Sequence, residues 1–176
     1  MAKISAGLLM FRTPGHRLEV LLVHPGGPFW SKKDAGAWFV PKGEVGENEV
    51  HVDAAKREFE EETGLRVDST LVALGSVKHK SGKIVHAWAF CGDCDPNLLR
   101  SNVFSMEWPP HSGETKEFPE VDRAAFFDVA LAKTKMYSSE FELVHRLEDW
   151  CKKEGLIRDE AEVRTESSEP VQRKLF

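Results

Sequence analysis

The sequence contains few of the features that mark secreted, membrane or nucleic-acid-coating proteins. Cysteine occurs only three times in 176 residues, which is too few for a disulfide framework. No apolar run is long enough to cross a membrane, and residues 1–15 lack the small-residue cleavage site of a signal peptide. Acidic residues outnumber basic ones by 29 to 24, which argues against a DNA-coating surface. We therefore expect a cytoplasmic protein with no membrane partner.

Repeats and low-complexity segments are also absent. With 41% hydrophobic and 30% charged residues, a chain of this length suits one globular domain. The last stretch is polar, so we predict a domain over residues 1–157 and a polar C-terminal tail over residues 158–176.

Two of the cysteines, Cys91 and Cys94, form a lone Cys-x-x-Cys spacing. A structural zinc site normally needs four protein ligands, and His79 and His86 lie near enough in sequence to complete one. The simpler interpretation, which we prefer, is two reduced thiols at the end of a strand.

Short apolar runs predict a β-sheet that begins with a hairpin. Residues 4–11 and 18–23 are apolar runs joined by a Pro-Gly turn. Residues 83–91 are mostly apolar on both faces, which predicts a central strand that is covered on both sides. Further strands are expected over residues 37–40, 70–77, 103–108 and 124–127.

Two segments have the spacing of amphipathic helices. The later one covers residues 139–154, where Ser139 and Glu142 predict a capping box. Its apolar stripe indicates a packing helix and consists of Phe141, Val144, Leu147 and Cys151. The earlier helix carries Glu58 and ends before Gly64, a residue suited to the left-handed backbone that follows many helices.

Acidic residues crowd into the segment from Glu44 to Glu62. Eight acidic side chains against two basic ones give this segment a net charge of −6, so the rest of the chain, at −5 overall, sums to +1. On a helical wheel Glu58, Glu61 and Glu62 share an arc of about 100°. The apolar face beside that arc consists of Val52, Ala55 and Phe59.

Ion pairs along the helix account for only part of this charge. Arg57 is placed to pair with Glu61, and Lys56 with Glu60. The remaining like charges beside an apolar stripe repel one another unless a cation lies between them. Because clustered carboxylates are suitable ligands for Mg²⁺ or Mn²⁺, a divalent-metal site is predicted here.

The segment resembles the Nudix box: Gly, five residues, Glu, seven residues, Arg-Glu-apolar, any residue, Glu-Glu, any residue, Gly-apolar. The matching residues, with no position missing, are Gly43, Glu49, Arg57, Glu58, Phe59, Glu61, Glu62, Gly64 and Leu65. The order of strands and helices around the box also fits this family. The resemblance therefore implies an α/β fold, an α/β/α sandwich around a mixed β-sheet.

The resemblance also implies metal-dependent hydrolysis of a nucleoside diphosphate linked to another moiety. By position, Mg²⁺ or Mn²⁺ would be held by Glu58, Glu61, Glu62 and the carbonyl of Gly43. Arg57 would orient these carboxylates, and Glu49 and Gly64 would support the motif at the two ends of the helix.

The general base would be a box glutamate or a carboxylate from a later loop, which offers Glu114, Glu117 and Glu120. Glu120 resembles the family's acidic residue ahead of an aromatic pair, although an ordinary loop carboxylate is the open alternative. The catalytic candidates are thus Glu58, Glu61, Arg57 and Glu120.

Residues 37–44 resemble the Trp-x-x-Pro-Lys-Gly motif of Nudix enzymes that cut dinucleoside polyphosphates such as diadenosine tetraphosphate. The substrate-binding candidates are Lys42, Lys78 and Lys80 for phosphate and Trp38 for a base, with a solvated turn as the alternative for the hairpin lysines. Residues 21–30 and 107–113 resemble a bacterial Nudix subgroup, and the Gly/Pro loop over residues 24–36 is a candidate lid.

Three hypotheses for function remain open. The first is a Nudix hydrolase acting on dinucleoside polyphosphates. The second is the same chemistry on ADP-ribose, a nucleotide sugar, a nucleoside triphosphate or a capped RNA. The third is a nucleotide sensor without catalytic activity, although the complete set of box glutamates argues against it.

Overall fold

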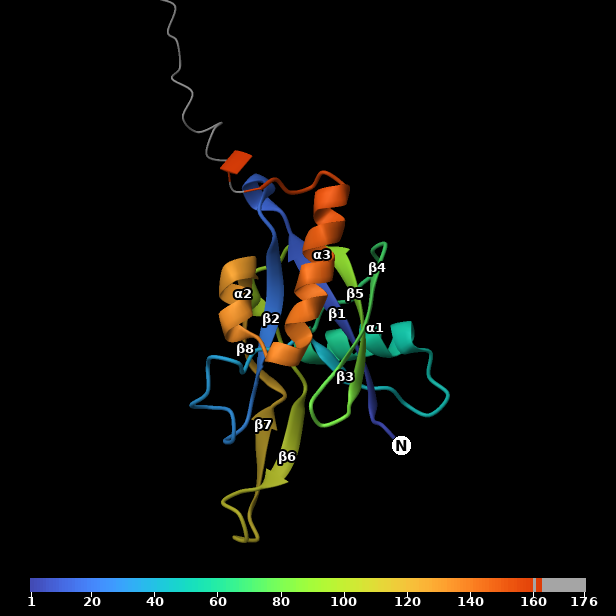
Figure 1. Ribbon diagram of the computed structural model, residues 1–176. Helices are drawn as coiled ribbons and strands as arrows, with labels where there is room; N and C mark the ends of the chain where they lie inside the picture. The colour runs from blue at the N-terminus through green and yellow to red at the C-terminus, as the bar shows by residue number, and fades with distance from the viewer. Residues whose placement is uncertain (160, 163–176) are drawn as a thin grey trace, which may run out of the picture.

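The computed structural model describes residues 1–159 and 161–162, and its centre is a six-stranded sheet (Figure 1). Five strands lie in the order β4-β5-β1-β2-β8, and β3 pairs with β1. The bounds are β1 Ile4–Arg12, β2 Glu19–Pro25, β3 Lys42–Glu44, β4 Val72–Lys78, β5 Ile84–Cys91 and β8 Val121–Asp128. β1 and β5 are parallel, whereas the pairs β1–β2, β1–β3, β2–β8 and β4–β5 are antiparallel. The prediction of a mixed sheet that begins with a hairpin is confirmed.

Helices cover both faces of the sheet, with α2 and α3 in front of it and α1 behind it in Figure 1. The bounds are α1 His51–Thr63, α2 Val129–Lys135 and α3 Phe141–Lys153. α1 packs through Phe59 against Phe90 of β5, and α3 packs through Val144 and Leu147 on the side of Val85. Since Phe90 and Val85 lie on opposite faces of β5, that strand is covered on both sides. The predicted α/β/α sandwich is confirmed.

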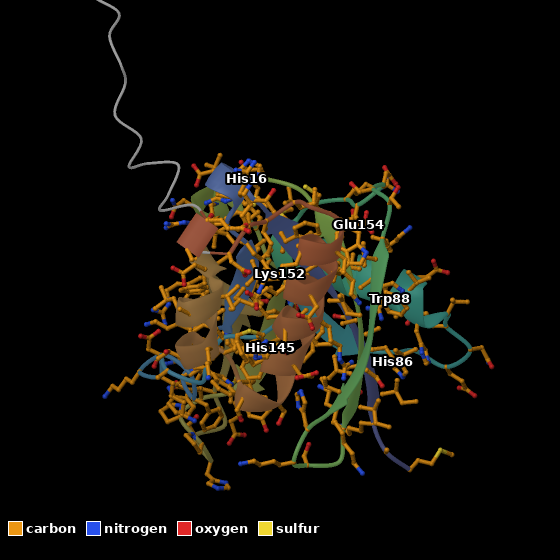
Figure 2. All side chains as sticks on the ribbon, turned by 45° about the horizontal axis from the view of Figure 1, so that its top comes forward. His16, His86, Trp88, His145, Lys152 and Glu154 are labelled. Carbon is orange, nitrogen blue, oxygen red and sulfur yellow. The ribbon has the colours of Figure 1, made fainter. Side chains whose placement is uncertain are left out.

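α3 buries its predicted apolar stripe except for Phe141, which is partly buried, and turns its polar face outward, where His145 and Lys152 lie (Figure 2). The predicted capping box is wrong, because a 3₁₀ helix, η3, occupies Ser138–Glu140 and no side chain caps α3. Glu140, the last residue of η3, instead points into the protein and is fully buried.

The sheet is split at one end by the segment that precedes α1. β1 and β2 pair only near Phe11 and Arg12. Beyond that point the segment lies between them, so that Val23 of β2 pairs with Phe39 and Gly7 of β1 pairs with Lys42. In place of the strand predicted over residues 37–40, only Trp38 and Phe39 form isolated bridges, because they pair with different neighbours, Met136 and Val23.

The strand predicted over residues 103–108 does not join this sheet. β6, Val103–Glu107, pairs with an unpredicted β7, Thr115–Pro119, in a separate two-stranded ribbon that projects from the body of the protein (Figure 1). Its aromatic side chains contact the Gly/Pro loop, where the rings of Phe29 and Trp108 meet edge to face at 5.5 Å.

Two further findings bear on the predicted organisation. No helix in the part of the chain that the structure describes is long and apolar enough to span a membrane. The predicted tail over residues 158–176 lies mostly outside the described residues.

Two short 3₁₀ helices complete the described elements, η1 at Pro14–His16 and η2 at Pro96–Leu98.

Candidate active site

α1 places the carboxylates by burying the face beside them. Ala54, Ala55 and Phe59 are completely buried, which fixes the rotation of the helix against the sheet. The helix ends at Gly64, whose φ of 78° lies in the left-handed region, and its N–H donates to the carbonyl of Glu60 at 2.7 Å. The predicted position of Gly64 at the end of the helix is confirmed.

Gly43 is in close contact with a carboxylate of α1. A Cβ atom at this position would lie 2.0 Å from the carboxyl carbon of Glu58, so no larger residue fits without moving one of them. β3, which contains Gly43, and α1 are therefore packed so that the backbone of residue 43 touches a predicted metal ligand. This contact is a physical reason for glycine here that does not depend on backbone conformation.

Arg57 donates hydrogen bonds to three carboxylates and to one main-chain carbonyl. Its guanidinium donates to both carboxylate oxygens of Glu49 at 2.8 and 3.0 Å, which holds the pKa of Glu49 at about 2. It also donates to Glu58 at 2.6 Å, to Glu61 at 3.2 Å and to the carbonyl of Glu44 at 3.1 Å. Arg57 thus holds two candidate metal ligands in place and ties the loop before α1 to the helix.

Glu62 is the most perturbed carboxylate of the group. Burial raises its pKa to about 8, and the negative charges of Glu58 and Glu120 add to that rise. The positive charge of Lys42 and a hydrogen bond from its main-chain N–H, at 3.1 Å, oppose the shift only in part. A carboxylate in this position gains stability from any additional cation.

Glu120 lies among the same carboxylates although it is far away in sequence. The main-chain N–H of Asn102 donates to the carbonyl of Glu61 at 2.7 Å, and the N–H of Glu120 donates to the carbonyl of Asn102 at 2.8 Å. Burial, together with the charges of Glu61 and Glu58, raises the pKa of Glu120. By contrast, Glu117 lies exposed on the ribbon in β7.

The carboxylates have the chemistry of a divalent-metal site. Among the described residues, no three His, Cys, Asp or Glu side chains are grouped so as to hold a metal ion as they stand. Glu58 and Glu61 point to Arg57, and Glu62 points to the backbone of Lys42. Burial raises the pKa of Glu58, Glu62 and Glu120, and the negative charges of neighbouring carboxylates add to that rise; a hard cation would nevertheless favour their charged forms. The residues present therefore fit Mg²⁺ or Mn²⁺.

The alternative zinc site at Cys91 and Cys94 is not supported. His79 contacts Glu140 at 2.9 Å, and the ring of His86 lies 4.5 Å from that of His51, so each has a partner other than the cysteines. Both thiols are free.

The predicted substrate-binding residues do not all lie at the site. The side chain of Trp38 is in the core, 5% exposed, with its ring against His24 and Phe127 and its indole N–H bonded to Asp34 at 2.9 Å. The prediction that Trp38 binds a base is therefore not supported by the structure. Its neighbour Phe39 faces the other way.

The aromatic ring in the lining of the site belongs to Phe39, a residue that the sequence interpretation missed. Phe39 stacks on Tyr137, with ring centres 5.3 Å apart, and the Lys42 ammonium lies 4.3 Å from the centre of the Phe39 ring. Lys78 and Lys80 are exposed on the β4–β5 hairpin. Lys83 is half-buried, and its pKa is lowered by burial and by the nearby charge of Lys42.

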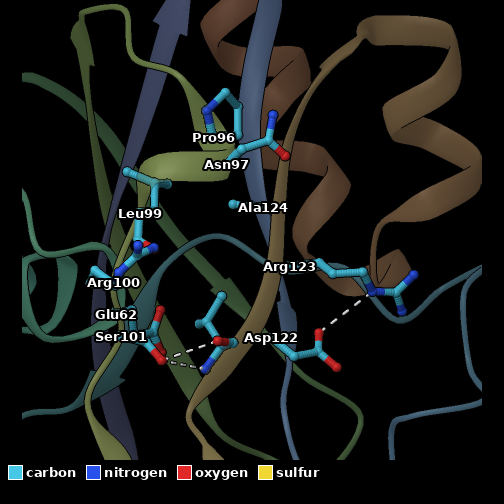
Figure 3. Close-up of a pocket in the computed structure, with 10 residues that line it drawn as sticks. Glu62, Pro96, Asn97, Leu99, Arg100, Ser101, Asp122, Arg123 and Ala124 are labelled. Carbon is cyan, nitrogen blue, oxygen red and sulfur yellow. Dashed lines mark hydrogen bonds and ion pairs between the residues drawn. The ribbon is translucent and has the colours of Figure 1, made fainter.

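Two pockets meet at Glu62. One, of about 130 Å³, is lined by Phe39, Lys42, Glu62 and Glu120 together with Val23, Pro25, Val40 and Val121. The other, of about 250 Å³, lies between η2 and β8 and is mostly polar (Figure 3). Its lining includes Asn97, Arg100 and Ser101, while the Arg123 side chain points away from it toward Asp122. Glu62 thus stands between an aromatic pocket and a polar one.

The Gly/Pro loop is anchored beside these pockets by a buried histidine. His24 of β2, which the sequence places in the loop, is completely buried and contacts Asp122 and the carbonyl of Lys33, each at 2.7 Å. The N–H of Gly26 donates to the carbonyl of Glu120 at 3.0 Å. The loop therefore borders the site at the position of Glu120.

Comparison with known proteins identifies this arrangement. A protein-family model described as the NUDIX domain matches residues 1–147. The chain belongs to the Nudix family. As a Nudix hydrolase, it acts on phosphoric anhydride bonds, and the contacts of Gly43, Arg57 and Glu58 are those of its Nudix box.

Solved structures share the Nudix fold at low sequence identity. A Caenorhabditis elegans Ap4A hydrolase in a binary complex is 18% identical, with a TM-score of 0.59 over 85% of this chain and 98% of that one. The NUDIX domain of Shewanella oneidensis NrtR, complexed with ADP ribose, is 14% identical, with a TM-score of 0.59 over 85% and 88%. A MutT protein from Methanosarcina mazei is 19% identical, with a TM-score of 0.55 over 86% and 96%. At these identities the similarity establishes the fold alone.

Proposed function

We propose that this Nudix hydrolase is a divalent-metal-dependent pyrophosphohydrolase that cleaves a nucleoside diphosphate linked to another moiety, with dinucleoside polyphosphates as the preferred substrates. The observation that carries this proposal is a group of four carboxylates, Glu58, Glu61, Glu62 and Glu120, whose charges act on one another; Glu62 lines both pockets and Glu120 lines the aromatic one. Such a group repels an anionic substrate unless a cation is bound as well. The cation is therefore required for substrate binding as well as for chemistry.

Different residues of the chain would have different roles in the reaction. Glu58, Glu61, Glu62 and the backbone of Gly43 would hold Mg²⁺ or Mn²⁺. The metal, when bound, would withdraw charge from the phosphate oxygens and lower the pKa of a bound water. Arg57 holds the carboxylates of Glu58 and Glu61 in place through its ion pairs.

Glu120 is the preferred general base. Its pKa is raised from the ordinary value of a carboxylate, which makes it a better proton acceptor near neutral pH. It lines the aromatic pocket beside Glu62 and is anchored through its backbone to Asn102 and Gly26. A base in this position would take a proton from the attacking water without moving the backbone.

Lysines and aromatic rings support a substrate with several phosphates and a base. Lys42 lines the aromatic pocket, and Lys78 and Lys80 lie exposed on the β4–β5 hairpin, where they would reach a polyphosphate chain. Phe39 and Tyr137 offer stacked rings for a nucleobase, in place of Trp38. The polar pocket beside Glu62 would receive the second moiety. The fold shared with an Ap4A hydrolase is consistent with this substrate.

ADP-ribose is the second candidate substrate. The polar pocket, with Asn97, Arg100 and Ser101 in its lining, offers hydrogen-bonding groups suited to a sugar hydroxyl as well as to a nucleoside. A Nudix domain of similar fold is known in complex with ADP ribose. Both candidates are cleaved at a phosphoric anhydride bond, so the chemistry assigned to the carboxylates is the same.

The test is product identification by mass spectrometry after incubation with a panel of nucleoside diphosphate derivatives in ¹⁸O-labelled water. The panel contains dinucleoside polyphosphates, ADP-ribose, nucleotide sugars, nucleoside triphosphates and a capped RNA, each with Mg²⁺ and with EDTA. We expect Mg²⁺-dependent cleavage, with dinucleoside polyphosphates cut most efficiently and the label in one phosphate product. Cleavage in EDTA, or no cleavage of any substrate, would refute the proposal.

Glu120→Gln is expected to lower kcat by roughly a hundredfold to ten-thousandfold, because a positioned base contributes about that much. The amide keeps the shape of the side chain but cannot accept the proton from water. Glu117→Gln, on the exposed face of the ribbon, is the matched control and should keep wild-type turnover. Equal kcat values for the Glu120→Gln variant and the wild type would remove Glu120 from the mechanism.

A further inference from the structure

Glu140 is a fully buried carboxylate at the start of α3, and both of its oxygens are occupied. Oε1 accepts from Nζ of Lys42 at 2.8 Å and from Nε2 of His79 at 2.9 Å, and Oε2 accepts from the main-chain N–H of Val40 at 3.0 Å. Burying a carboxylate is unfavourable unless such donors meet it. The residue is therefore not an ordinary helix-capping glutamate but the centre of a polar cluster.

The partners of Glu140 belong to the segment that leads into the Nudix box. Lys42 directly precedes Gly43 in the chain, and Val40 lies three residues before it. The main-chain N–H of Lys42 donates to Glu62, while its ammonium reaches Glu140. Lys42 thus contacts Glu62 of α1 through its backbone and Glu140, at the start of α3, through its side chain. It does so where the sheet is split between β1 and β2. His79 ties the β4–β5 hairpin to the same point.

The Lys42 ammonium lies in a largely buried position, paired with Glu140. The Lys42 side chain is only 9% exposed, and it lies over the ring of Phe39 at the wall of the aromatic pocket. Lys83 is close enough for its pKa to be lowered by the Lys42 charge. The two ammonium groups repel each other, and Glu140, which pairs directly with Lys42 at 2.8 Å, supplies the buried negative charge that opposes this repulsion.

We propose that Glu140 is a positioning residue, which holds the Lys42 ammonium at the wall of the substrate pocket and keeps the backbone of residues 40–42 against Glu62. Its effect on the reaction passes through Lys42 and rests on the proposed function, in which Lys42 contacts substrate phosphate. The placement of the ammonium itself does not depend on any substrate. The two parts can therefore be tested separately.

The first test measures the ammonium directly, by ¹H–¹⁵N NMR of the lysine side chains in the wild-type protein without substrate. A buried, ion-paired Nζ exchanges its protons slowly, so we expect one protected lysine signal that disappears in Lys42→Met. In Glu140→Gln the Lys42 signal should exchange at least about tenfold faster, whereas in Glu142→Gln, which changes an exposed carboxylate two residues further along, it should not change. Absence of a protected Lys42 signal in the wild type would overturn the proposal even if Glu140 variants did not fold.

The second test is a double-mutant cycle on kcat/KM with the best substrate from the panel. Glu140→Gln should lower kcat/KM by about 10- to 100-fold, mainly by raising KM, and Glu140→Asp should recover part of the loss. In the Lys42→Met background the same Glu140→Gln change should cost less than about threefold, because Glu140 acts through Lys42. A purely structural residue would instead lower the folded fraction and the apparent kcat, with KM unchanged.

The outcomes separate this inference from the proposed function. Equal losses from Glu140→Gln in both backgrounds, or a loss confined to kcat and matched by a lower melting temperature, would overturn the positioning role. If no substrate in the panel is cleaved, the proposed function fails, but the NMR result still decides whether Glu140 places the Lys42 ammonium. Fast exchange of Lys42 in the wild type, together with normal activity, would refute the positioning role alone.

Discussion

Glu61→Gln should lower turnover by roughly a hundredfold to a thousandfold while leaving the fold intact. The Glu61 carboxylate is one third exposed and pairs with Arg57 at 3.2 Å, so it contributes no apolar packing to the core. Its replacement by an amide of the same shape removes one negative ligand from the four-carboxylate group. The measurement is kcat at saturating Mg²⁺ with the best nucleotide substrate, together with the melting temperature of the metal-free protein.

Glu60 provides the matched control for this variant. It is the preceding residue of the same helix, but it is exposed and lies on the opposite face, away from the carboxylate group. Glu60→Gln should therefore keep wild-type turnover and the same Mg²⁺ dependence. If Glu61→Gln retained near-wild-type turnover at saturating Mg²⁺, Glu61 would not be an essential metal ligand.

The helix α1 could be predicted from sequence because the pattern that specifies it is local. Helical periodicity sets the rotation of α1, and the burial of Ala55 and Phe59 follows from the apolar spacing. Helical periodicity therefore predicts Glu58, Glu61 and Glu62 on one face without any knowledge of the sheet. The end of the helix at Gly64 could also be predicted, since a residue that tolerates positive φ suits that position.

The substrate side of the site could not be predicted in the same way. Trp38 and Phe39 are adjacent, and which ring enters the core is decided by the pairing of Phe39 with Val23 and of Trp38 with Met136. Those partners are distant in sequence, so the local pattern gives no preference between the two aromatic residues. The choice of Trp38 followed from a motif resemblance, whereas the structure places Phe39 at the pocket.

Glu140 shows the same limit for a buried charge. From sequence it belongs to the start of an amphipathic helix, beside Ser139 and Glu142, which have the spacing of a capping box. Its actual partners, Val40 and Lys42, are about a hundred residues away. The local sequence pattern does not distinguish a carboxylate that caps a helix from a buried carboxylate that pairs with a lysine distant in sequence.

Glu62→Gln should stabilise the metal-free protein at alkaline pH even though it removes a candidate metal ligand. The pKa of Glu62 is about 8 in the folded state against an ordinary value of 4.5, so the folded state binds this proton more tightly than the unfolded one. The favourable contribution is complete below pH 4.5 and is lost as the pH rises through 8, where the folded protein must bury a charge. At about pH 9 in EDTA, Glu62→Gln should therefore unfold with a free energy roughly 2–4 kcal/mol higher than the wild type, and at about pH 5 the two should differ little.

Metal binding should reverse the order of stability of these two proteins. Mg²⁺ stabilises the folded state in proportion to its affinity, and the wild type keeps the complete set of carboxylates that would bind it. We therefore expect millimolar Mg²⁺ to raise the melting temperature of the wild type and to leave that of Glu62→Gln nearly unchanged. Glu60→Gln, whose carboxylate is exposed, should follow the wild type under every condition. A melting temperature for Glu62→Gln no higher than that of the wild type at about pH 9 in EDTA would show that the buried charge of Glu62 does not destabilise the fold, and the repulsion proposed as the reason for metal binding would then need another source.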